Sequence, residues 1–115
     1  NQEFDYNAQS ADVLKLEKQI MNNLALSYYK LKEYQKSINL DIIIISKDPQ
    51  FDKSYARLFN CYKELNNFDN AFYFGNLLKT RFTPETLEKY KDILKDIREK
   101  GYEECISCRM VQINQ

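Results

Sequence analysis

Lys53 and Arg57 are the side chains of this sequence best suited to bind an anion. Their i, i+4 spacing places them side by side on a helix, where two like charges cost about 0.2 to 0.5 kcal/mol. The positions one helical turn away hold no carboxylate: they are Pro49, Ala56, Asn60 and Cys61. We therefore expect an anion from outside the chain to relieve this pair.

Cys105 and Cys108 have the spacing of zinc ligands or of a redox motif. A zinc site needs two more ligands, and the chain has no His and only Cys61 besides. A redox motif of this kind belongs in a βαβ context, which the sequence lacks. No nucleophile-base pair or glycine-rich phosphate loop is present either. We expect no metal, no cofactor and no enzymatic activity.

Composition limits the remaining classes. The 115 residues suit one domain, and only two Gly and two Pro favour long helices. Lys+Arg and Asp+Glu balance at 17 each, so we expect no nucleic-acid partner. No apolar run approaches the roughly 20 residues of a membrane span, so we expect a cytoplasmic protein. The missing initial Met suggests a fragment of a longer one. The oligomeric state is left open.

The elements that position Lys53 and Arg57 are two copies of one helix-turn-helix pattern, 34 residues apart. The matching pairs are Leu24 and Leu58, Tyr28 and Tyr62, Tyr34 and Phe68, and Ser37 and Ala71. This period and pattern resemble the tetratricopeptide repeat. The resemblance implies an all-α tetratricopeptide repeat superhelix. It has repeats at about residues 18–51 and 52–83 and a capping helix at 84–100, so that the domain covers 10–100.

Apolar spacing and helix signals predict where the helices lie. We expect them over residues 10–31, 34–47, 52–65 and 68–79, with turns at 32–33 and 66–67. Residues 1–9 are expected to be a flexible lead-in, and 101–115 a tail that can form a further helix. The isoleucine run at 42–45 alone favours a strand, but the 34-residue register favours a helix.

Two local features sharpen this prediction. Phe59 stands where repeats of this type usually have a small residue, and Gly75 where they usually have an aromatic one. We expect the Phe59 ring to fill the space over Gly75, which conserves the summed volume. The sequence Thr83-Pro84-Glu85 is a strong helix start, and Gly101 is a candidate end.

A more specific resemblance concerns the co-chaperones. Residues 22–34 resemble the second repeat of FK506-binding immunophilins, whereas residues 53–60 and 81–89 resemble the last repeat and capping helix of the Hop-type organiser. Both families bind the C-terminal Glu-Glu-Val-Asp tail of heat-shock protein 90 or 70 through a carboxylate clamp. The resemblance implies that the clamp consists of Asn23, Lys53, Arg57 and Asn60. Ser27, Lys30 and Glu64 are expected to line the same groove.

The match to the clamp is partial. A family clamp has five residues, and its first Lys and Asn come from a repeat before Asn23, for which residues 1–19 provide no helix of the right kind. Either a first repeat lies upstream, with a prolyl isomerase domain outside this fragment, or the clamp is incomplete. The alternative is a tetratricopeptide scaffold of another assembly, in which Lys53 and Arg57 are ordinary surface charges.

Overall fold

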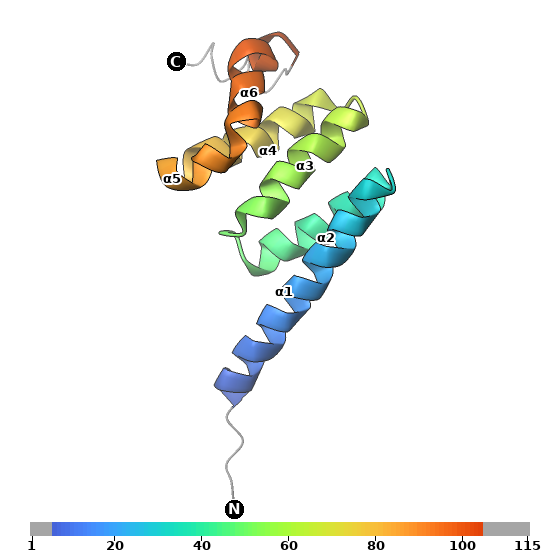
Figure 1. The fold of residues 1–115 in the computed structure, drawn as a ribbon, viewed down its shortest axis with the longest axis vertical. Coiled ribbons are helices and arrows are strands. Elements are labelled where there is room, and N and C mark those ends of the chain that lie inside the picture. Colours follow the sequence, from blue (N-terminus) through green and yellow to red (C-terminus); the bar gives the residue numbers. More distant parts are fainter. Residues whose placement is uncertain (1–5, 105–115) are drawn as a thin grey trace, which may run out of the picture.

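The chain folds into helices joined by short turns in the part that the computed structural model describes, which is the backbone of residues 6–104 and the side chains of 11–99 (Figure 1). The elements in order are α1 Tyr6–Lys30, α2 Tyr34–Lys47, α3 Asp52–Glu64, α4 Phe68–Arg81, α5 Pro84–Leu87, the 3-10 turn η1 Glu88–Tyr90, and α6 Lys91–Glu104. No strand occurs in these residues, so the predicted all-α class is confirmed.

The first four helices form two hairpins, α1 with α2 and α3 with α4 (Figure 1). The same backbone turn joins each pair. Lys32 and Asn66, 34 residues apart, both adopt positive φ, at 63° and 59°. The next residue of each turn donates its N–H to a carbonyl five residues earlier, at 2.8 Å from Glu33 and 2.9 Å from Asn67. The 34-residue period is thus present in the backbone as well as in the sequence.

Most helix boundaries agree with the predicted ones. The helix α2 has the expected bounds and includes the isoleucine run, while α3 ends one residue early and α4 two residues late. The start of α1 at Tyr6 is four residues before the predicted one. Ion pairs of Lys18 with Asp48, at 2.9 Å, and of Lys47 with Glu17, at 3.5 Å, mark the level at which α2 ends beside α1. Beyond it, the N-terminal part of α1 projects from the other helices (Figure 1).

The core between α3, α4 and α6 is built around Phe59 and Gly75. The Phe59 ring is buried, and its Cδ1 lies 2.9 Å from where a Cβ on Gly75 would stand, which confirms the predicted exchange of volume. Ile97 of α6 uses the same space, with its Cδ1 at 2.6 Å from that point. A side chain at position 75 would therefore push both α3 and α6 away from α4.

The chain after α4 differs from the single capping helix that we predicted. Thr83 caps the next turn as expected, its hydroxyl accepting a hydrogen bond from the N–H of Thr86. The predicted 84–100 helix is interrupted by η1, however, and α6 continues past Gly101, where we expected it to end. The predicted tail helix beyond residue 104 and the Cys105 and Cys108 pair lie outside the described residues. None of the described helices has the length and apolar character needed to cross a membrane.

Candidate functional site

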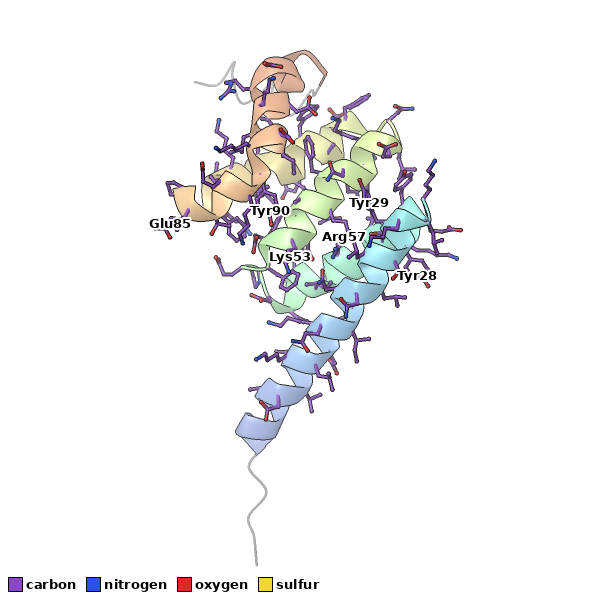
Figure 2. The ribbon with its side chains drawn as sticks, in the orientation of Figure 1. Tyr28, Tyr29, Lys53, Arg57, Glu85 and Tyr90 are labelled. Atoms are coloured by element: carbon purple, nitrogen blue, oxygen red, sulfur yellow. The ribbon has the colours of Figure 1, made fainter. Side chains whose placement is uncertain are left out.

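An open pocket of about 360 Å³ lies between α1, α3 and η1. We call it the α1/α3 groove; its lining residues are Asn22, Leu26 and Tyr29 of α1, Lys53, Ala56, Arg57 and Asn60 of α3, and Tyr90 of η1. Figure 2 shows Tyr29, Lys53, Arg57 and Tyr90 gathered where these elements approach one another. The groove combines apolar and aromatic surface with two cationic side chains.

Three of the four predicted clamp residues line this groove from α3. Lys53, Arg57 and Asn60 lie at i, i+4 and i+7 of that helix, a spacing that places them on one face. Lys53 is exposed and makes no ion pair with any residue that the structure describes. Its ammonium group is therefore free to receive an anion.

Arg57 does not have the free charge that the sequence predicted. Its side chain is only 8% exposed and is paired with Asp41 of α2, which is fully buried. The Arg57 Nη2 lies 2.7 Å from Asp41 Oδ1, and its Nε lies 2.9 Å from Asp41 Oδ2. The Nη2 also donates to Asn22 Oδ1 of α1 at 2.7 Å. The expectation that Arg57 awaits an external anion is wrong, because its carboxylate partner lies on α2 and not on its own helix.

This buried network connects three helices through one guanidinium. Burial raises the pKa of Asp41, whereas the hydrogen bonds and charge of Arg57 act in the opposite direction. The bidentate geometry satisfies both carboxylate oxygens, which a buried charge requires. Arg57 therefore serves first to hold α1, α2 and α3 together. In the groove it contributes a guanidinium group whose position is fixed by these bonds.

Tyr90 bounds the groove at its η1 end. The Tyr90 hydroxyl donates a hydrogen bond of 2.5 Å to Asp52 Oδ2, at the start of α3. Burial and this carboxylate both raise the pKa of Tyr90, so the phenol stays protonated at neutral pH. Lys89 lies 3.8 Å from the same carboxylate. The carboxylate of Asp52 is thus engaged by Tyr90 and Lys89 of η1, and it does not pair with the adjacent Lys53.

The other predicted site residues are not brought to the groove. Asn23, Ser27, Lys30 and Glu64 are exposed and do not line it. The side chains that α1 supplies instead are Asn22, Leu26 and Tyr29. Each of them lies one position before a predicted residue, and they keep the i, i+4 and i+7 spacing. The Ser27 hydroxyl binds the carbonyl of Asn23 within α1.

The displacement from Asn23 to Asn22 has a geometric cause. Repeat numbering equates Asn23 with Arg57, and Arg57 points back from α3 toward α1 and α2. A residue at the same position of α1 therefore points away from α3, to the opposite flank of α1. Other counterparts do share the groove, because Asn22 and Leu26 of α1 correspond to Ala56 and Asn60 of α3 and all four line it.

Cys61 is the remaining reactive group near the site. It is fully buried, and burial raises the pKa of its thiol to about 11, which leaves little thiolate at neutral pH. No group of three or more His, Cys, Asp and Glu among the residues with described side chains is arranged to hold a metal ion. No protein-family model, no curated protein and no solved structure matches the chain.

Proposed function

We propose that the chain is a protein-interaction module of the tetratricopeptide type, and that its α1/α3 groove binds an extended peptide segment carrying an acidic group. The repeat assignment is supported by the two 34-residue hairpins and by their shared turn geometry. The binding role depends on one observation, the unpaired ammonium of Lys53 beside the apolar surface of Leu26 and Tyr29. A peptide that pairs an acid with an apolar residue would use both features.

The chemistry of the groove suits a weak, exchangeable contact. Lys53 offers a charge-assisted hydrogen bond, worth about 1.5 to 3 kcal/mol, and Asn60 an amide donor beside it. Leu26 and Tyr29 are both partly exposed, so covering them removes apolar area from water. After the cost of association, a few such contacts correspond to roughly micromolar affinity.

Selection from a random-peptide display library tests this proposal without a presumed partner. We expect the selected peptides to be enriched in Asp or Glu and to lose at least about 10-fold in affinity on Lys53→Glu, as one lost charged contact implies. The matched control is Lys79→Glu, the same charge change at an exposed lysine of α4 outside the groove. Selected peptides without acidic residues, or peptides equally sensitive to both variants, would overturn it.

A carboxylate clamp for the Glu-Glu-Val-Asp tail of heat-shock protein 90 or 70 is the second candidate. The observation in its favour is that Lys53, Arg57 and Asn60 all line the groove. Against it stand the pairing of Arg57 with Asp41 and the outward position of Asn23. The clamp also needs residues that residues 6–104 do not supply.

A pair of synthetic peptides separates the two candidates. We would titrate the chain with Glu-Glu-Val-Asp bearing a free C-terminal carboxylate and with its C-terminal amide. A clamp requires binding that collapses on amidation and on Lys53→Ala. A groove that reads acidic side chains should bind both forms within about threefold, since roughly one weak contact differs. Arg57→Ala is unsuitable here because it also leaves Asp41 unpaired.

A further inference from the structure

An exposed apolar stripe runs along α1 on the flank away from α3. Val13, Leu16, Ile20 and Leu24 are 54%, 57%, 57% and 42% exposed, and their 3- and 4-residue spacing places them on one face. Val13 and Leu16 lie on the part of α1 that projects beyond α2 (Figure 1). An isolated projecting helix is marginal in water, and a continuous apolar face of this kind marks an interaction surface.

In the second hairpin, the face of α3 that corresponds to this stripe is buried. The residues of α3 that correspond to Ile20 and Leu24 are Ser54 and Leu58, and both are fully buried. Leu58 packs on Ile38 of α2 and belongs to one apolar cluster with it. The flank of α3 is thus covered by α2, whereas the same flank of α1 is exposed.

We propose that a second copy of the chain covers this stripe, with the two α1 helices packed antiparallel about a twofold axis at Ile20. The stripe is symmetric about that residue, because Leu16 and Leu24 each lie four positions from it. An axis there sets Ile20 against the partner's Ile20 and Leu16 against the partner's Leu24, which is the self-complementary contact that a twofold dimer requires.

The charges beside the stripe fit the antiparallel arrangement. Asp12 and Lys30 are exposed, form no ion pair with any residue whose side chain is described, and lie along the same edge of α1 at 100° per residue. With the axis at Ile20, Asp12 of one copy lies about 3 Å along the helix from the level of the partner's Lys30. Each dimer would therefore gain two ion pairs, whereas a parallel twofold pair would place Asp12 and the partner's Lys30 at different levels and form neither pair.

This dimer leaves the α1/α3 groove open. Asn22, Leu26 and Tyr29 lie on roughly the opposite side of α1 from Ile20, since successive residues turn by about 100°. Dimerisation and peptide binding can therefore be tested independently. A failure of one would not touch the other.

Sedimentation equilibrium under reducing conditions tests the proposal. We expect a mass that rises toward twice 13.8 kDa with protein concentration. Ile20→Glu should raise the dissociation constant at least about 10-fold, because it places two charges at the axis. The control Ile43→Glu makes the same change at an isoleucine of α2 that is 43% exposed, and should leave the constant unchanged. Circular dichroism checks that both variants remain helical.

Charge exchange tests the antiparallel register. Asp12→Lys and Lys30→Asp should each weaken the dimer by about 3- to 10-fold, and the double variant should recover the original constant, as exposed pairs of this strength allow. A mass that stays at 13.8 kDa up to millimolar concentration would overturn the proposal. So would a dimer that survives Ile20→Glu, or a double variant no better than the single ones.

Discussion

The helices α1 and α3 hold the same position in two copies of one hairpin, yet their surroundings differ. Leu24 of α1 is 42% exposed, whereas its counterpart Leu58 of α3 is fully buried. Both residues follow the same apolar pattern in the sequence. What differs is the neighbour, because α3 packs against α2 and no described helix covers the corresponding flank of α1. Repeat numbering therefore predicts which face can be buried, and the neighbouring element decides whether it is.

The second helices of the two hairpins, α2 and α4, also differ at an equivalent buried position. Asp41 of α2 and Gly75 of α4 are 34 residues apart, and both are buried against the next helices. Asp41 receives Arg57 of α3, while Gly75 makes room for Phe59 of α3 and Ile97 of α6. One position thus supports an ion pair in the first hairpin and close apolar packing in the second.

The sharpest way to separate the two hairpins is to truncate the counterparts Arg57 and Asn23. Arg57→Ala leaves the carboxylate of Asp41 buried and unpaired, so we expect a loss of about 3 to 5 kcal/mol in the free energy of unfolding. Asn23→Ala changes an exposed side chain and should cost less than about 0.5 kcal/mol. Urea unfolding followed by circular dichroism measures both.

A paired replacement controls for this effect. The double variant Asp41→Leu with Arg57→Met removes both charges and keeps apolar volume, so it should recover most of the stability lost in Arg57→Ala. Similar losses in Arg57→Ala and Asn23→Ala would show that the Arg57 network does not distinguish the hairpins.

Sequence reasoning succeeded where local signals decide and failed where a distant helix intervenes. The turns at Lys32 and Asn66 and the contact of Phe59 with Gly75 were predictable from period, turn chemistry and volume. The partner of Arg57 was not, because Asp41 lies 16 residues away and reaches it only through the packing of α2 on α3. The shift from Asn23 to Asn22 was missed for a related reason, since a repeat alignment gives equivalent positions but not the neighbouring helix toward which each side chain points.

Thiol reactivity measures the same difference between the hairpins by another route. Cys61 and Ser27 are counterparts, one fully buried and one exposed. In a background with Cys105 and Cys108 changed to serine, we expect Cys61 to react with a thiol reagent at pH 8 at least about 100-fold more slowly than a cysteine introduced by Ser27→Cys. The introduced cysteine is measured in a separate variant that also carries Cys61→Ala. The protein is kept dilute so that dimerisation does not shield position 27.

The pH dependence of stability provides an internal check on Cys61. Its pKa is raised by burial from an ordinary 9.0 to about 11, so the unfolded chain loses this proton first. The contribution of the thiol is therefore complete below pH 9 and is lost as the pH rises toward 11. We expect the free energy of unfolding of the wild type to fall more steeply over this range than that of Cys61→Ala. Equal slopes, or equal labelling rates for the two cysteines, would mean that α3 is no better covered than α1.

The smallest expected difference concerns the residues that begin α2 and α4. Glu33 and Asn67 are counterparts with similar backbone angles, but only Asn67 accepts a side-chain hydrogen bond, from the N–H of Asn70. Glu33→Asp shortens the side chain to cap length and keeps the negative charge that the helix N-terminus favours. We expect it to raise the free energy of unfolding by about 0.5 kcal/mol, and Asn67→Ala to lower it by about the same amount. Urea midpoints of the two variants measure the changes, and a loss of stability in Glu33→Asp would show that the two turns, despite their common backbone, cap their helices differently.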